Sequence, residues 1–233
     1  MKLIRRIIGK CCHLFHISVA KVSCRKGRVF MLHWVGDDSL TPKQTPFCVS
    51  ILQFEKFAQW LCNKNVIHLE DWESENDFCA LTFDDVPESF YNNAYPILRK
   101  YSIPFTLFVN ISLLDKTGYI SRAQLIEISR CDLCTIGSHG VEHGETAMLT
   151  KQQFLNDLSQ SKEELEAIIG GTVKLYAYPY GSYYACGYKN KHLSQRVYSY
   201  AFSTVNCPIT RPMFLGKYFL PRINVDNDFI NAL

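Results

Sequence analysis

The sequence contains no long uninterrupted run of apolar residues, although 47% of its 233 residues are hydrophobic. A membrane-spanning helix requires about 20 consecutive apolar residues, and the core of a secretory signal peptide also needs an unbroken apolar stretch. We therefore expect neither element. Repeats, low-complexity segments and linkers are also missing, which predicts one folded domain.

The chain also lacks an excess of either charge. It carries 25 Lys and Arg against 22 Asp and Glu, so its formal net charge is only +3. This balance is typical of a soluble globular protein. It argues against a nucleic-acid-binding protein and against a disordered chain.

Acidic residues are absent from the N-terminal segment, and the first carboxylate in the chain is Asp37. Residues 1–28 carry eight Lys or Arg, and apolar residues recur between them at helical spacing. This pattern predicts a basic amphipathic helix. The helix could contact an anionic membrane surface through residues 1–20, or its apolar face could close one end of the domain. We treat residues 29–233 as the folded domain.

The ten cysteines lack the spacing of a disulfide framework or of paired metal knuckles. The single CxxC pattern, Cys131 to Cys134, has no partner pair, and we expect both thiols to be small apolar fillers near a strand. Many unpaired thiols suit a reducing compartment. We therefore expect a cytoplasmic protein. If it contacts the inner face of the membrane, we expect the N-terminal segment to make that contact.

Strand-like and helix-like segments alternate along the rest of the chain. Strands are predicted at 28–34, 66–69, 80–83, 104–109, 134–136, 173–178, 200–204 and 218–225, and helices at 50–61, 89–101, 121–128, 150–169 and 192–198. This alternation predicts a mainly parallel sheet, in either a barrel or a doubly wound α/β fold.

Two adjacent carboxylates, Asp84 and Asp85, end the apolar strand that begins at Ala80. Burying two acids side by side is costly unless a cation or hydrogen bonds compensate them, and each raises the pKa of the other. A metal ion on one carboxylate would leave the other free for proton transfer. The alternative is a strand end with two solvated acids, one of which caps the next helix.

Further polar residues follow later strands: His139 after 134–136, and Tyr180 after 173–178. The carboxyl ends of parallel strands meet on one face, where barrel enzymes build their active sites. Asp85, His139 and His143 supply a carboxylate and two imidazoles, and such a set leaves coordination positions open for water and substrate. An HxxxH spacing alone arises easily by chance, but three polar motifs in order on successive strand ends are a sharper signal.

Those motifs, Thr-Phe-Asp-Asp, Ser-His-Gly-Val-Glu-His and Tyr-Pro-Tyr-Gly, resemble the polysaccharide deacetylases of carbohydrate esterase family 4 from about residue 30 to 225. The resemblance implies a single distorted (β/α)7 barrel and metal-dependent removal of N-acetyl groups from amino sugars. It implies that Asp84 is the catalytic base and that Asp85, His139 and His143 bind the metal, with Zn expected and Co or Ni as alternatives. Tyr180, through its backbone amide, and Tyr178 would contact the oxyanion or the substrate.

Two family features are missing. The family's third motif begins with an arginine, where this chain has Ala177, and the late Leu-x-His motif is absent. The only histidine after His143 is His192, inside a predicted helix.

Two other residues could supply these groups. His33 ends the first predicted strand, as in the circularly permuted exopolysaccharide deacetylases of the family, where that histidine protonates the leaving amine; the alternative is a core or rim histidine. Arg222, on the last strand, could lie beside Asp84, or it could form an ordinary surface ion pair.

These observations predict a metal-dependent N-deacetylase that acts on an N-acetylated glycan, or on its precursor, in exopolysaccharide or capsule synthesis. Two alternatives stay open. One is a non-catalytic barrel that binds glycan or serves as a scaffold. The other is an amidohydrolase of the same fold that acts on another small amide.

Overall fold

The computed structural model describes residues 24–37, 47–187, 190–211 and 216–233, together with Ile7, Lys10, Cys11 and Leu14. The amphipathic helix and the membrane contact predicted for the N-terminal segment fall almost wholly outside the described residues. Across the described part of the chain, every helix is too short or too polar to cross a membrane.

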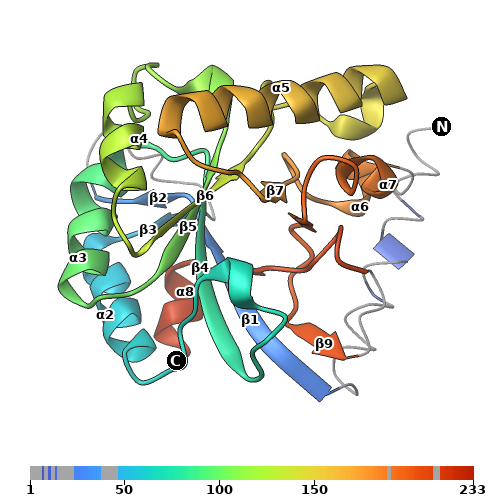
Figure 1. Cartoon of the computed structure of the whole chain (residues 1–233). Helices are drawn as coiled ribbons and strands as arrows, with labels where there is room; N and C mark the ends of the chain where they lie inside the picture. Colours follow the sequence, from blue (N-terminus) through green and yellow to red (C-terminus); the bar gives the residue numbers. More distant parts are fainter. Residues whose placement is uncertain are drawn as a thin grey trace.

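Seven parallel strands form the central sheet, in the order β10-β1-β4-β5-β6-β7-β8. Their bounds are β1 (Cys24–Leu32), β4 (Phe78–Asp84), β5 (Phe105–Val109), β6 (Cys134–Ser138), β7 (Leu175–Ala177), β8 (Tyr200–Phe202) and β10 (Ile223–Asn224). An eighth strand, β9 (Ile209–Arg211), pairs antiparallel with β1. Figure 1 shows the sheet curled, with the larger helices on its outer side.

The segment 220–224 closes the sheet, because it pairs with strands from both edges. Leu220 forms a parallel bridge with Phe202 of β8, and Ile223 pairs in parallel with Phe30 of β1. The single strand predicted over 218–225 is therefore shorter than expected, but it joins the first strand to the last. The sheet is a closed, distorted barrel, and the (β/α)7 prediction is confirmed.

The helices are α2 (Ile51–Leu61), α3 (Tyr95–Lys100), α4 (Arg122–Ser129), α5 (Lys151–Ile169), α6 (Tyr183–Cys186), α7 (Lys191–Ser194) and α8 (Asn227–Asn231). Most of the described helices, though not α3 or α7, begin at a residue whose side chain caps the helix. Ser50 caps α2, and Thr150 with Gln153 forms the predicted capping box of α5. Gly170 ends α5 in the left-handed conformation, with φ 68°.

Other segments differ from the prediction. Residues 89–101 divide into a π-helical turn, η2 (Phe90–Ala94), and the helix α3. Pro96, which cannot donate a helical hydrogen bond, lies in the first turn of α3. Residues 66–69 make only an isolated bridge from Val66 to Cys79, and a 3-10 turn, η1 (Leu69–Asp71), follows. The other 3-10 turns are η3 (Ile111–Leu113) and η4 (Thr146–Met148), and β2 (Trp34–Val35) pairs with β3 (Cys48–Val49) in a small second sheet.

The barrel has two hydrophobic layers. One lies between the sheet and the surrounding helices; the other fills the barrel. The inner layer consists of Val29, Leu69, Trp72, Phe78, Ala80, Phe108, Leu175, Ala177, Phe202, Ile209 and Leu220. Trp72 comes from the loop before β4 and is fully buried, so this loop closes the end of the barrel opposite the carboxyl ends of the strands.

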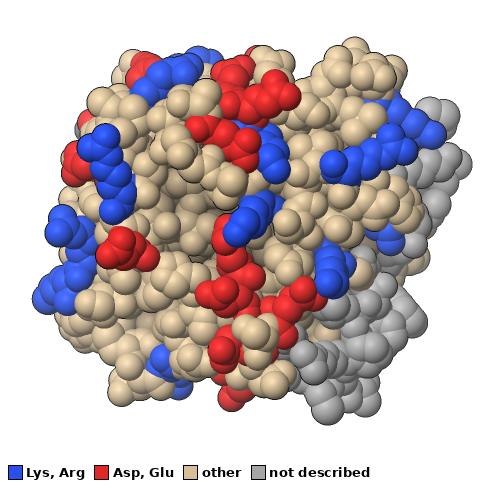
Figure 2. All heavy atoms as spheres, viewed as in Figure 1, with Lys and Arg blue, Asp and Glu red and all other residues tan. Residues whose placement is uncertain are grey.

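Ion pairs hold the Trp72 loop in place. Lys174 Nζ lies 3.1 Å from Glu70 Oε2, and Lys217 Nζ lies 2.6 Å from Glu73 Oε1. The Tyr200 hydroxyl donates to Glu73 Oε2 at 2.7 Å. Figure 2 shows Asp and Glu side chains gathered in the lower middle of this face, over the loop. These exposed pairs orient the loop and contribute little to stability by themselves.

Trp72→Ala is expected to lower the free energy of unfolding by about 3–5 kcal/mol, because it empties the closed end of the barrel. Urea denaturation followed by circular dichroism measures the loss. Trp60→Ala is the matched control, since Trp60 is only partly buried on α2. Equal losses for the two variants would contradict a plugging role for Trp72.

Candidate metal centre and active site

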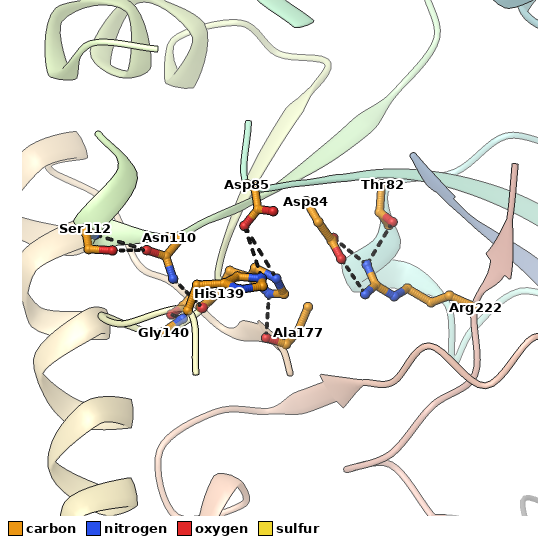
Figure 3. A network of polar contacts seen from close by, with 11 residues as sticks. Thr82, Asp84, Asp85, Asn110, Ser112, His139, Gly140, Ala177 and Arg222 are labelled. Atoms are coloured by element: carbon orange, nitrogen blue, oxygen red, sulfur yellow. Dashed lines mark hydrogen bonds and ion pairs between the residues drawn. The ribbon is translucent and has the colours of Figure 1, made fainter. Parts of the chain in front are cut away.

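A sharp backbone turn at the end of β4 separates the two adjacent carboxylates. Asp85 and Val86 both adopt positive φ, at 62° and 50°, which costs energy for residues other than glycine. The Asp85 N–H donates to Phe108 O at 3.1 Å, and the Ile120 N–H donates to Val86 O at 3.3 Å. Figure 3 shows the result: Asp85 faces His139, and Asp84 faces Arg222.

The three predicted metal ligands lie together at the carboxyl ends of β4 and β6. Asp85 Oδ1 is 3.8 Å from His139 Nε2 and 3.5 Å from His143 Nε2. One possible ligand atom from each of the three residues lies within 4.8 Å of the other two. The backbone therefore brings one carboxylate and two imidazoles to a single point.

The chemistry of these groups fits a divalent cation. His139 Nδ1 lies 2.8 Å from the carbonyl oxygen of Ala177, so Nδ1 carries the proton and Nε2 keeps its lone pair toward Asp85. Asp85 Oδ1 is buried and makes no hydrogen bond to the described residues. Burial raises the pKa of Asp85, although the nearby His139 opposes this shift. A bound cation would compensate this carboxylate, and two nitrogens with one oxygen suit Zn, Co or Ni.

Asn110, a residue not predicted from the sequence, positions His139. The Asn110 side-chain amide donates to His139 O at 3.1 Å, and its Oδ1 accepts from the Ser112 N–H and hydroxyl. Asn110 is fully buried directly after β5. A polar residue just past a buried strand is the signal that identified Asp84 and His139, so the same rule finds Asn110.

Asp84 forms a buried, two-pronged ion pair with Arg222. The Arg222 Nη1 donates to Asp84 Oδ1 at 2.6 Å, and Nη2 donates to Asp84 Oδ2 at 2.7 Å. Arg222 is fully buried and Asp84 is 1% exposed. Burial alone would raise the pKa of Asp84, but Arg222 and the neighbouring His139 hold it well below its usual range.

Two of the three remaining N–H donors of Arg222 are also occupied. Its Nε donates to Ser203 O at 3.0 Å, and Nη1 donates to the Thr82 hydroxyl oxygen at 3.2 Å. Thr82 in turn donates to Phe30 O at 2.8 Å. The guanidinium carbon lies 5.2 Å from the centre of the Phe108 ring. These contacts fix the guanidinium, and through it the orientation of Asp84, inside the mouth of the barrel.

His33 directly follows β1 and is half-buried between aromatic rings. Its ring stacks on Trp34 with a centroid distance of 5.7 Å and lies 4.7 Å from the Phe47 ring. Burial lowers the pKa of His33 to about 4, although the charge of Asp84 acts in the opposite direction. His33 Nδ1 is buried without a hydrogen-bond partner among the described residues. Without a bound substrate, the His33 imidazole is therefore neutral at pH 7.

The two tyrosines of the third motif lie differently. Tyr180 is 55% exposed, has φ 58°, and its ring lies 4.6 Å from that of His143. Its N–H donates to none of the described residues. The Tyr178 side chain is fully buried, and its hydroxyl is hydrogen bonded to Ser194 and to Tyr218 O. The structure therefore brings Tyr180, but not the Tyr178 side chain, to the site.

The loop that carries Tyr180 depends on the next residue, Gly181. Gly181 has φ 50°, and a Cβ placed there would lie 2.4 Å from Thr204 Cγ2. Its carbonyl accepts from the Thr204 N–H at 2.9 Å. Only glycine allows this close approach, which holds the third motif against the segment after β8.

A sequence profile described as polysaccharide deacetylase matches residues 73–193, which include Asp84, Asp85, His139, His143 and Tyr180. The chain belongs to the polysaccharide deacetylase family. Deacetylases of this family are hydrolases that act on amide bonds and use a divalent metal, and the Asp85, His139 and His143 set agrees with such a site.

Individual relatives extend this result. A poly-beta-1,6-N-acetyl-D-glucosamine N-deacetylase of Staphylococcus aureus (strain MRSA252) is 27% identical over 209 residues, covering 80% of this chain and 71% of that protein. The protein YxkH of Bacillus subtilis (strain 168) is 27% identical over 141 residues, covering 56% of this chain and only half of that protein. A crystal structure of a Bacillus cereus polysaccharide deacetylase has the same fold, with a TM-score of 0.78 and 21% identity over 89% of this chain and 68% of its own.

Proposed function

We propose that this member of the deacetylase family removes N-acetyl groups from a poly-N-acetylglucosamine exopolysaccharide. The observation that carries the proposal is the buried Asp84–Arg222 pair beside the Asp85, His139 and His143 set, at the mouth of one barrel. The Staphylococcus aureus relatives that bear the poly-N-acetylglucosamine name support the substrate class.

Asp85, His139 and His143 would hold the divalent ion, and we propose zinc, with cobalt and nickel as substitutes. When bound, such an ion lowers the pKa of a water molecule and polarises the acetyl carbonyl. The Tyr180 N–H, which has no partner among the described residues, would donate to the carbonyl oxygen as negative charge develops there.

The reaction forms a carbon–oxygen bond to water and breaks the carbon–nitrogen bond to the sugar, so one proton passes from water to the amine. We assign acceptance of this proton to Asp84 and delivery to His33. The low pKa of His33 means that His33 does not begin the cycle protonated; it must gain its proton during turnover. We assign the source of that proton to Asp84: when Asp84 gives up the proton taken from water, it regains the negative charge that acts to raise the pKa of His33.

The Asp84–Arg222 ion pair argues against the alternative that this barrel is non-catalytic. The best support for that alternative in the sequence is the absence of the family arginine at Ala177, together with the absence of the late histidine. We propose that Arg222 replaces the missing arginine, and the donation of both its guanidinium arms to Asp84 supports this. A barrel that only binds glycan has no need for a buried carboxylate whose two oxygens are both held in place.

The test is acetate release from β-1,6-linked N-acetylglucosamine oligomers by the protein loaded with zinc or cobalt. His33→Ala is expected to reduce the rate by about 10²–10⁴-fold, because the leaving amine loses its proton donor. Metal content should stay unchanged in that variant. His192→Ala is the control, since His192 is exposed on α7. Unchanged release in His33→Ala would remove His33 from the mechanism, and no release by the metal-loaded wild type would contradict the proposed substrate.

We also propose that the protein works in a reducing compartment and meets a membrane surface through its basic N-terminal segment. The eight cysteines whose side chains are described are all free thiols, which supports the first point. Cell fractionation tests both points: recovery in the cytosolic and peripheral-membrane fractions agrees with them, and recovery outside the cell contradicts them.

A further inference from the structure

The metal ligand His143 lies at the end of a short loop, residues 140–143, which we call the ligand loop. His139 is held by its own strand and by Asn110, but His143 stands four residues past the end of that support. The position of His143 therefore depends on what holds the backbone of the ligand loop.

One side of the ligand loop is held by the turn after β5. The Ile111 N–H donates to Gly140 O at 3.1 Å, and the Ser112 N–H donates to Val141 O at 3.0 Å. These bonds occupy the carbonyl groups of the loop. The N–H groups of Val141 and Glu142 form their hydrogen bonds on the opposite side of the loop.

On the other side, the Gly140 N–H donates to Ser138 Oγ at 3.1 Å, and the next two N–H groups are held by one carboxylate, Asp157 of α5. The Val141 N–H donates to Asp157 Oδ1 at 3.0 Å, and the Glu142 N–H donates to the same oxygen at 3.4 Å. Burial raises the pKa of Asp157, whereas these two N–H groups act to lower it. The described contacts give this carboxylate no lysine or arginine partner. Both described hydrogen bonds that the Asp157 side chain accepts come from the ligand loop.

The approach between helix and loop is close, and it requires Gly140. Gly140 has φ 83°, and a Cβ placed there would lie 3.0 Å from Asp157 Oδ2. The Asp157 side chain itself is well anchored, because the neighbouring Phe154 and Leu158 are fully buried and the capping box at Thr150 fixes the start of α5.

We infer that Asp157 is a positioning residue for the metal centre, which fixes the ligand loop so that His143 Nε2 faces Asp85. This inference rests on the metal-dependent function proposed above. Outer groups that orient metal ligands typically change metal affinity about 10–100-fold when they are removed. Asp157 acts through backbone amides rather than through the imidazole, so its removal should let the loop relax while the helix and the barrel stay folded.

The experiment measures zinc affinity by competition with a chromophoric chelator, using the full chain in its metal-free form. Asp157→Ala is expected to weaken zinc binding about 10–100-fold. Asp157→Asn keeps one oxygen acceptor and should restore most of that affinity. Asn156→Ala is the control, since the exposed neighbour Asn156 bonds only to Gln152 on the same helix. The melting temperature of each metal-free variant shows whether it folds.

A second readout follows the coordination geometry directly. The visible spectrum of the cobalt-loaded protein should change in Asp157→Ala and return toward wild type in Asp157→Asn. Wild-type affinity and an unaltered cobalt spectrum in Asp157→Ala would overturn the inference, whatever the rate of acetate release. Failure of the wild type to bind zinc or cobalt would instead overturn the metal-dependent function. Equal losses in Asp157→Ala and Asp157→Asn would also contradict positioning by a hydrogen-bond acceptor.

Discussion

Asp84→Asn is expected to lower acetate release by about 10²–10⁴-fold and to leave the metal content close to that of the wild type. Asparagine has nearly the shape of aspartate, but its side chain cannot accept the proton that water must lose. Metal content should persist because Asp84 faces Arg222, whereas Asp85 faces His139 and His143. The measurements are acetate release and metal analysis on the same preparation.

Asp85→Asn provides the matched comparison, since it makes the same chemical change at the neighbouring position. That variant should lose the metal first, and activity as a consequence. Loss of metal in Asp84→Asn with retention in Asp85→Asn would reverse the two roles. Because Asp84→Asn leaves Arg222 without an anion, its unfolding must be measured alongside the rate.

Arg222→Met is expected to lower the free energy of unfolding by about 3–5 kcal/mol, because it leaves the buried Asp84 carboxylate without a counter-charge. Methionine retains much of the arginine side-chain volume, so the loss reports charge rather than a cavity. Urea unfolding at neutral pH measures it. Asp84→Asn combined with Arg222→Met removes both charges and should recover most of the stability, although not the activity.

The same pair predicts opposite pH dependences in the two proteins. In the wild type, Arg222 holds the pKa of Asp84 below its value in the unfolded chain, about 3.9. This contribution to stability is present above that value and is lost as the pH falls through the folded pKa. In Arg222→Met, burial raises the pKa of Asp84, so acidification neutralises the buried charge and stabilises the variant. The stability gap between the two proteins should therefore narrow as the pH falls from 7 toward 4, and a gap independent of pH would contradict the ion pair.

Local sequence predicted which side chains come together where a residue's position follows from its place at a strand end. Asp84, Asp85 and His139 each end or follow a buried strand, and parallel pairing brings such positions to one face. The alternation of strands and helices left open a barrel or a doubly wound sheet. The pairing of Leu220 and Ile223 with opposite edges decides between them, and such pairing depends on contacts distant in sequence.

The supporting residues were harder to predict for the same reason. Thr82 and Asp157 look like an ordinary strand residue and an ordinary helix residue, and their roles arise from partners 140 and 16 positions away. Tyr178 differs from its prediction in the opposite direction. Its motif suggested a site residue, but the alternation of side chains along the strand end places its side chain in the core.

Closure of the barrel by segment 220–224 has a consequence for biosynthesis. Asp84 and Arg222 are 138 positions apart, and a ribosome adding about 5–20 residues per second needs about 7–28 s to pass from one to the other. Throughout that interval the nascent chain holds a strand-end carboxylate whose guanidinium partner has not been made, so packing that strand into a dry interior is unfavourable. We therefore expect the Asp84 carboxylate to delay packing of its strand until translation reaches the segment that both closes the barrel and supplies the counter-charge.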